Sequence, residues 1–164
     1  MAEFAPEEIL KVLEAHAVRY VVIGGFAGII HGSPNGTSDV DITPDEGRDN
    51  LRRLSGALDE LEANIRTAGE PAGVPFRHDG PSLGAVRIWN LTTRFGDLDI
   101  SFEPSGTRGY DDLAARALRV RLPQVETTVA ALSDVIRSKE AAGRLKDQLT
   151  LPTLRRILEE GNPT

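Results

Sequence analysis

The sequence places two aspartates one residue apart inside an otherwise apolar expected strand, and this arrangement needs a physical reason. Residues 21–42 read VVIGGFAGIIHGSPNGTSDVDI, in which Asp39 and Asp41 alternate with Val40 and Ile42. Because residues i and i+2 of a strand point to the same face, the two carboxylates lie side by side and their apolar neighbours face the core. Like charges this close repel each other, and a divalent cation bound between them makes the arrangement favourable.

The same alternation returns later in the chain. Residues 94–102 read RFGDLDISF and place Asp97 and Asp99 on one face of a second expected strand. Asp99 is flanked by apolar residues, as Asp41 is, whereas Asp97 directly follows a glycine at the expected start of the strand. An ordinary solvent-facing strand also alternates polar and apolar residues, but two such strands favour a shared metal site in which Asp99 is the third carboxylate.

A glycine pair, Gly24 and Gly25, separates the apolar strand expected at 20–23 from a short helix. Without a Cβ, such a pair lets backbone N–H groups approach a phosphate closely. Ser33 and Thr37 precede the first aspartate, where they either serve as turn residues or add hydroxyl groups to the same site. We therefore assign these four residues to a candidate phosphate-binding region.

Competing motifs fail on spacing or composition. A calcium loop that started at Asp39 would need glycine at its sixth position and glutamate at its twelfth, where the chain has Pro44 and Asn50. The sequence lacks G-x-G-x-x-G and the G-K-[ST] of a P-loop, and the absence of cysteine excludes disulfides and thiolate metal sites. A glycosyltransferase-type D-x-D remains open, but it leaves the glycine pair and the later strand unexplained.

Composition and charge narrow the range of partners. The formal net charge of −6 argues against non-specific coating of nucleic acid, although basic residues outnumber acidic ones between residues 106 and 146. No apolar run approaches the roughly 20 residues that span a bilayer. The acidic, amphipathic start of the chain does not resemble a secretory signal, so we expect a cytoplasmic protein with no membrane contact.

Helical and strand patterns are mixed without regular βαβ alternation, which predicts an α+β fold around a mixed sheet. We expect a single domain over residues 1–164, with a core at about residues 5–105 and a helical part at about residues 106–164. Strands are expected at 20–23, 39–42, 85–91, 94–102 and 125–129. Helices are expected at 6–17, 26–32, 45–68, 110–118, 132–142 and from 152 onward. A loop region is expected at 69–84, with at most one short strand near 74–76.

A glycine pair, a short helix, Asp-x-Asp on a strand and a third aspartate on a later strand together resemble the signature of the polymerase-beta-type nucleotidyltransferase superfamily. In this sequence the matching residues are Gly24, Gly25, Asp39, Asp41 and Asp99. The resemblance implies that the three aspartates are the catalytic and metal-binding residues and hold two Mg²⁺ ions. It also implies that an NTP is the donor of a nucleoside monophosphate and that pyrophosphate leaves.

A lysine lies on the apolar stripe of the helix expected at 132–142. From the pattern alone, Lys139 either extends past the core to water or delivers its ammonium into a cleft. The chain looks most like small bacterial members of the superfamily, of the MenT and AbiEii toxin kind, which often have a K…R-x-K-D run here. The run matches Lys139, Arg144, Lys146 and Asp147. The resemblance implies that Lys139 binds triphosphate oxygens, whereas we expect Lys146 and Asp147 to form a surface ion pair.

The resemblance also suggests an acceptor and a biological setting. We expect a Mg²⁺-dependent nucleotidyltransferase whose acceptor is RNA, such as a tRNA 3′ end, acting as the toxin of a toxin–antitoxin system with an antitoxin protein as partner. An antibiotic nucleotidyltransferase, acting on aminoglycosides or lincosamides, is the enzymatic alternative. A non-catalytic domain that binds nucleotide or a partner protein is the alternative of another class, and fold analogy alone does not decide between these functions.

Overall fold

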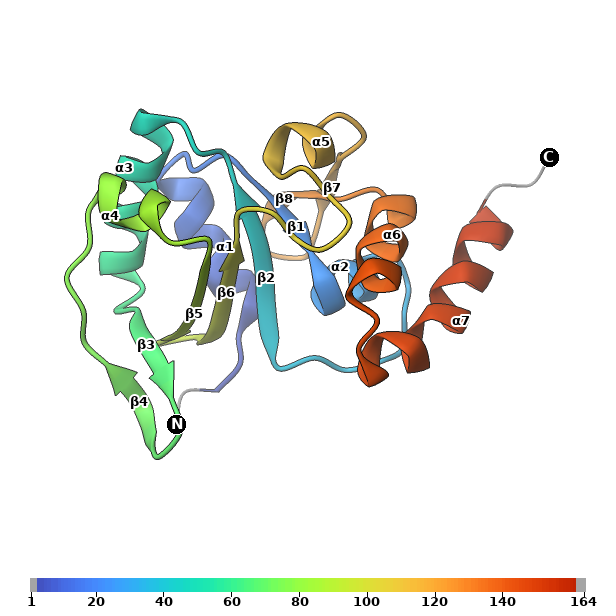
Figure 1. The fold of residues 1–164 in the computed structure, drawn as a ribbon, viewed down its shortest axis with the longest axis horizontal. Helices are drawn as coiled ribbons and strands as arrows, with labels where there is room; N and C mark the ends of the chain where they lie inside the picture. Colours follow the sequence, from blue (N-terminus) through green and yellow to red (C-terminus); the bar gives the residue numbers. More distant parts are fainter. Residues whose placement is uncertain (1–2, 162–164) are drawn as a thin grey trace.

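The fold is built on one mixed β-sheet whose central strands carry the aspartates singled out above (Figure 1). The computed structural model describes residues 3–161. Eight strands pair in the order β4-β3-β5-β6-β2-β1-β8-β7. The strands are β1 (Tyr20–Ile23), β2 (Asp39–Pro44), β3 (Asn64–Thr67), β4 (Glu70–Val74), β5 (Ile88–Thr93), β6 (Gly96–Ser101), β7 (Leu118–Arg121) and β8 (Glu126–Val129). The helices are α1 (Pro6–Ala15), α2 (Gly24–Ile30), α3 (Arg48–Glu60), α4 (Gly80–Ala85), α5 (Tyr110–Ala114), α6 (Leu132–Ala142) and α7 (Leu145–Gly161). The expected α+β class is confirmed.

Strands β1, β2 and β6 form the centre of the sheet, and their pairing sets the register of the aspartates. β1 runs antiparallel to β2, and β2 runs parallel to β6. In this register Asp39 lies opposite Asp97, and Asp41 lies opposite Asp99. Directly paired residues point to the same face of a sheet. The two alternating segments of the sequence therefore present their carboxylates on a common face.

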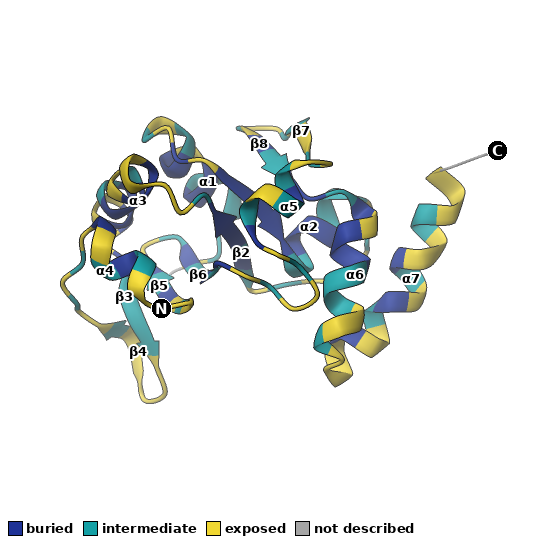
Figure 2. Ribbon diagram, turned by 45° about the horizontal axis from the view of Figure 1, so that its top comes forward, coloured by how far each residue is buried: buried dark blue, intermediate teal, exposed yellow. Residues whose placement is uncertain are grey.

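A single cluster of apolar side chains packs against the opposite face of these strands and around their ends. All four residues of β1 are buried, and in β2 and β6 the apolar residues that alternate with the aspartates, Val40, Leu98 and Ile100 among them, are fully buried. Figure 2 shows the buried residues in the central strands and on the inward faces of the helices. The alternation of the sequence is thus explained by one face in the core and one face at a cavity.

The helix expected at 45–68 is shorter than its apolar stripe suggests. α3 ends at Glu60, and Glu62 has a positive φ of 53°, which turns the chain out of the helix. Ile65 then lies in β3, which pairs with β5. The loop region expected at 69–84 contains β4 and α4. Helical spacing alone could not locate this boundary, because Ile65 fits the stripe of α3 and a buried strand position equally well.

The second half of the chain contributes strands as well as helices. The strand expected at 125–129 is confirmed as β8, but it is not an edge strand, because it lies between β1, with which it pairs in parallel, and β7. The helix expected at 110–118 ends at Ala114, and β7, which was not expected, follows it. α7 begins at Leu145 rather than at Pro152, which lies inside the helix. Within residues 3–161 no helix combines the length and the apolar character needed to cross a membrane.

Asn50 in the first turn of α3 ties that helix to the loop that precedes it, and its removal should lower stability. The side chain is buried, donates to the carbonyls of Arg19 (2.9 Å) and Asp45 (2.7 Å), and accepts from the Arg19 N–H (2.7 Å). Asn50→Ala leaves buried polar groups unpaired and should reduce the free energy of unfolding by about 2–3 kcal/mol in denaturant titrations. Asp49→Ala, at the exposed neighbouring position, should change it by less than about 1 kcal/mol. Equal losses in the two variants would contradict this role.

Candidate active site

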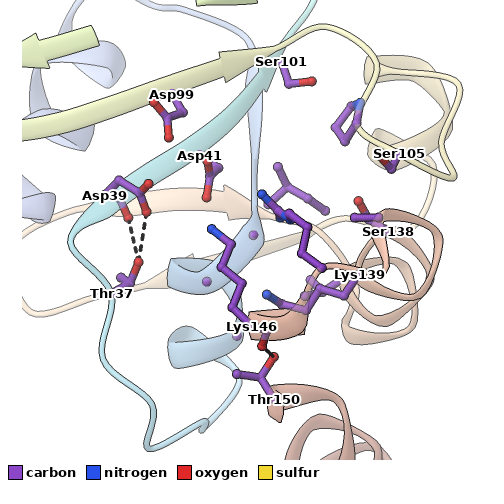
Figure 3. Close-up of a pocket in the computed structure, with 18 of the residues that line it drawn as sticks. Thr37, Asp39, Asp41, Asp99, Ser101, Ser105, Ser138, Lys139, Lys146 and Thr150 are labelled. Carbon is purple, nitrogen blue, oxygen red and sulfur yellow. Dashed lines mark hydrogen bonds between the residues drawn. The ribbon is translucent and has the colours of Figure 1, made fainter. Parts of the chain in front are cut away.

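Three carboxylates converge at one end of the central strands. Asp39 and Asp41 come from β2 and Asp99 comes from β6, and each offers an oxygen that lies within 4.8 Å of those of the other two (Figure 3). The structure therefore brings together the three aspartates that the sequence nominated. Asp97 shares their face but is not part of this group of three, and it is paired with Arg66, which also contacts Asp99. A cluster of carboxylate oxygens of this kind is the donor set that Mg²⁺ prefers.

The carboxylates of this cluster are held in an environment that disfavours their charge. Burial, together with the neighbouring charge of Asp39, raises the pKa of Asp41 to about 6. Burial, the contact with the Asp39 carboxyl and the charge of Asp41 raise the pKa of Asp99 to about 7, although Arg66 opposes the shift. A divalent cation would offset the mutual repulsion that these values reflect, so the residues present fit a metal site.

The structure gives a reason for glycine at position 24 that the sequence did not reveal. Its φ is +76°, and a Cβ added at this position would overlap Oδ2 of Asp41 and lie 2.9 Å from its Cγ. A Cβ on Gly25 would lie 3.1 Å from Oγ1 of Thr37. The glycine pair therefore makes room for the side chains of the aspartate strand and of the loop before it. Backbone approach to a phosphate, the role expected from the sequence, is compatible with this packing.

The hydroxyl residues before β2 have different surroundings. Thr37 donates through Oγ1 to Oδ1 of Asp39 (3.0 Å), so it orients the first carboxylate (Figure 3). Ser33 accepts a hydrogen bond from the backbone N–H of Asn35 (3.3 Å), as a turn residue does, and it also lines the cavity. Thr37 thus acts on the aspartates directly, whereas Ser33 lies farther along the wall.

The aspartates lie in a cavity of about 550 Å³ whose other wall comes from α6 and α7. Lys139 and Lys146 extend toward the aspartates in Figure 3, and both lysines, with Arg144, line the cavity. The positive charges of Lys146, Lys139 and Arg144 each favour the ionised form of Asp41 and oppose the rise in its pKa. Lys139 is thus directed into the cleft rather than past the core to water.

Asp147 is not part of a surface ion pair with Lys146, contrary to expectation. Its side chain is fully buried, and it accepts hydrogen bonds from Nε of Arg144 (2.8 Å) and from Nζ of Lys139 (3.4 Å). Burial alone would raise the pKa of Asp147, but Arg144 and Lys139 outweigh it and hold the pKa below its usual range. Asp147 therefore anchors the basic side chains of the cavity wall from beneath.

Sequence reasoning missed Arg66. Its Nη2 donates to Oδ1 of Asp99 (2.7 Å), and its Nη1 lies 3.3 Å from Oδ2 of Asp97. Arg66 was assigned to a long helix, so its proximity to the aspartates could not be inferred. The segment Asn64–Thr67 does contain β-branched residues at alternate positions, which is the one local sign of a strand there.

Comparison with solved structures shows the same fold in proteins of distant sequence. A candidate nucleotidyltransferase from Thermotoga maritima aligns with a TM-score of 0.53 and 18% identity over 97% of both chains. The lincosamide antibiotic adenylyltransferase LnuA, with lincomycin bound, aligns with a TM-score of 0.61 and 14% identity over 94% of this chain and 99% of its own. The antibiotic-resistance factor ANT(2'')-Ia aligns with a TM-score of 0.58 and 10% identity over 95% of this chain and 82% of its own.

These similarities establish the class of fold. Neither a protein-family model nor a curated protein matches the sequence. At identities of 10–18% the alignments show a shared architecture, and that architecture is the one found in nucleotidyltransferases. The chain therefore has a nucleotidyltransferase fold, as the aspartate and glycine pattern predicted.

The close approach of Gly24 to Asp41 generates a first prediction for the site. Gly24→Ala should destabilise the protein by about 1–2 kcal/mol through its positive φ alone, and it should also displace the Asp41 carboxylate. Gly36→Ala is the matched control, because it lines the same cavity and its added Cβ meets no described atom within 4 Å. Thermal unfolding and Mn²⁺ titration of both variants measure the two effects. Equal metal affinity in Gly24→Ala and wild type would contradict the steric argument.

The raised pKa values generate a second prediction. The folded protein holds the protons of Asp41 and Asp99 more tightly than the unfolded chain does, so without metal these groups lower stability as the pH rises from about 4 to about 7. Asp41→Asn removes the destabilising contribution of Asp41. In EDTA, the melting temperature of the variant should therefore rise relative to that of wild type as the pH increases across this window. Saturating Mg²⁺ at neutral pH should stabilise wild type more than the variant. A constant difference at all pH values would show that folding does not raise the pKa of Asp41.

Proposed function

We propose that this protein is a metal-dependent nucleotidyltransferase that moves a nucleoside monophosphate from an NTP to an acceptor hydroxyl. One observation carries the proposal: Asp39, Asp41 and Asp99 converge in a cavity whose opposite wall presents Lys139 and Lys146. Transfer of a nucleotidyl group needs two elements: carboxylates that hold the metal ions, and cations that hold the phosphates. A domain that only bound nucleotide would not need three converging carboxylates, two of which, Asp41 and Asp99, have pKa values raised by burial and by the neighbouring carboxyl groups.

Each aspartate has a distinct task in this proposal. Asp39 and Asp41 would hold two Mg²⁺ ions jointly, and Thr37 would keep Asp39 in the orientation that this requires. Asp99 would hold the ion nearer the acceptor and accept the proton of the attacking hydroxyl. Bound Mg²⁺ supplies charge stabilisation to the attacking and leaving oxygens. The bond from the acceptor oxygen to the α-phosphorus forms as the bond to the bridging oxygen breaks, and pyrophosphate leaves.

The triphosphate would lie between the glycine pair and the basic wall. Lys139 and Lys146 would bind its oxygens, and Asp147 would keep Lys139 and Arg144 in place from the protein side. Gly24 and Gly25 leave the backbone open to the phosphates, and the Ser33 hydroxyl lies on the same wall. The sequence-based assignment of these residues to nucleotide binding is retained as part of the proposal.

The remaining functional alternatives differ in the acceptor of the nucleoside monophosphate. The toxin hypothesis, with RNA as acceptor and an antitoxin as partner, stays a prediction, and so does the MenT and AbiEii resemblance. If the acceptor were RNA, the arginines between residues 106 and 146 would be the residues available to contact its phosphates, but several of them are ion-paired within the protein: Arg116 with Asp134, Arg119 with Glu14, and Arg121 with Glu126. Antibiotic adenylyl transfer is the second candidate, favoured by the alignment that covers 99% of LnuA.

Calorimetric titration with a non-hydrolysable NTP analogue tests the proposed function directly. Wild-type protein should bind the analogue in the presence of Mg²⁺ and lose that binding in EDTA. Asp41→Asn should lose most of the Mg²⁺-dependent binding while its circular dichroism spectrum stays unchanged. Binding that is equally tight with and without Mg²⁺, or in wild type and variant, would contradict a role for the aspartates in holding metal and nucleotide.

Lys139 provides a quantitative prediction. A charge-assisted contact to phosphate predicts that Lys139→Ala weakens NTP binding by about ten- to a hundredfold. Lys139→Met keeps the apolar stem, so it should lose as much binding as alanine if the ammonium holds phosphate, and little if only packing matters. Arg155→Met, an exposed basic residue of α7 paired with Glu140, is the control and should bind NTP as wild type does. Wild-type affinity in both Lys139 variants would remove this residue from the site.

A further inference from the structure

The geometry of the proposed reaction fixes the side from which the acceptor enters, so this inference rests on the proposed function. In-line displacement requires the attacking oxygen to approach the α-phosphorus from the side opposite the leaving pyrophosphate. The basic wall that would hold the leaving group lies on one side of Asp41, and Ser101 lies on the other side in Figure 3. The acceptor therefore enters over β6 and β5, beyond Asp99.

The sheet surface at that side of the cavity consists of paired residues of β5 and β6. Asn90 lies opposite Asp99, and Ile88 lies opposite Ser101, so all four share the face that carries the metal ligands. Ile88, Asn90 and Ser101 line the same cavity as the aspartates. Ile88 is 60% exposed, which is unusual for a large apolar side chain at the floor of a cavity and leaves its surface open to a ligand.

This surface carries no charge available to an acceptor. Among residues 3–161, the cavity lining includes no carboxylate other than Asp39, Asp41 and Asp99. The nearby Asp97 is paired with Arg66, and Arg66 is paired with both Asp97 and Asp99. Within the cavity lining, a polycationic acceptor thus finds no carboxylate beyond the three proposed metal ligands, and an anionic acceptor finds no cation on the side of β5 and β6.

We propose that Ile88, Asn90 and Ser101 form the acceptor subsite and that it takes a small, uncharged molecule that bears several hydroxyl groups, of the sugar type. The Asn90 amide and the Ser101 hydroxyl both donate and accept hydrogen bonds, which suits hydroxyl groups. The Ile88 side chain covers the apolar face that such a ring presents. The acceptor hydroxyl beside Asp99 attacks the α-phosphorus and gives its proton to that carboxylate, and pyrophosphate leaves toward Lys139.

Transfer of label tests the class of acceptor. A bacterial metabolite extract is freed of macromolecules and divided by ion exchange into neutral, cationic and anionic fractions. Each fraction is incubated with the protein, Mg²⁺ and α-labelled NTP. Kanamycin and total tRNA are incubated separately in the same way. The proposal expects labelled product in the neutral fraction. Label in the cationic fraction, in kanamycin, in the anionic fraction or in tRNA instead would overturn it. If the protein binds NTP in a Mg²⁺-dependent way but no sample is labelled, the proposed subsite is wrong and the proposed function still stands. If the protein does not bind NTP at all, both proposals are wrong.

Two substitutions locate the subsite without relying on turnover. Asn90→Asp adds a carboxylate beside Asp99, so with Mg²⁺ present it should bind kanamycin about tenfold more tightly than wild type in calorimetric titrations. Asn35→Asp adds the same charge to the cavity on the side of the phosphate-binding loop, and it should leave kanamycin affinity near the wild-type value. Thermal unfolding verifies that both variants fold. Tight binding of kanamycin by wild type, or an equal gain in both variants, would contradict the proposed position.

Discussion

The mutual repulsion of three carboxylates is the constraint to which the rest of the structure responds. The parallel register of β2 and β6 brings Asp39, Asp41 and Asp99 to one point, and burial makes the charges of Asp41 and Asp99 more costly still. Position 24 requires glycine, because its φ is positive and because any side chain there would collide with Asp41. A cluster with this cost has a clear physical use only where cations are bound, which is why the aspartates define the site more strongly than any other feature.

Cations from distant parts of the chain surround this cluster. α6 and α7 supply Lys139 and Lys146, whereas β3 supplies Arg66 from the other side of β6. Buried Asp147 holds the basic wall together, so the position of Lys139 depends on a carboxylate that itself never reaches the cavity surface. The central sheet and the C-terminal helices thus form one electrostatic unit, in which acidic and basic parts meet across a cavity that admits a ligand (Figure 3).

The parts of this architecture that depend on local sequence patterns could be predicted from the sequence, whereas the parts that depend on long-range contacts could not. The alternation around Asp41 and Asp99 and the glycine pair were readable because each depends on spacing along a single strand or turn. The roles of Arg66 and Asp147 were not readable, because both arise from partners brought close only by the folded chain. The end of α3 was missed for a related reason, since the turn at Glu62 leaves no signal in the apolar spacing.

The central claim is that Asp39, Asp41 and Asp99 hold divalent metal together with the phosphates of an NTP. A crystal structure with Mn²⁺ and a non-hydrolysable NTP analogue, analysed by anomalous scattering, measures this most directly. The account predicts anomalous peaks between the three aspartates, with the triphosphate in contact with the metal on one side and with Lys139 on the other. A nucleotide bound elsewhere, or a bound nucleotide with no metal at these carboxylates, would contradict it.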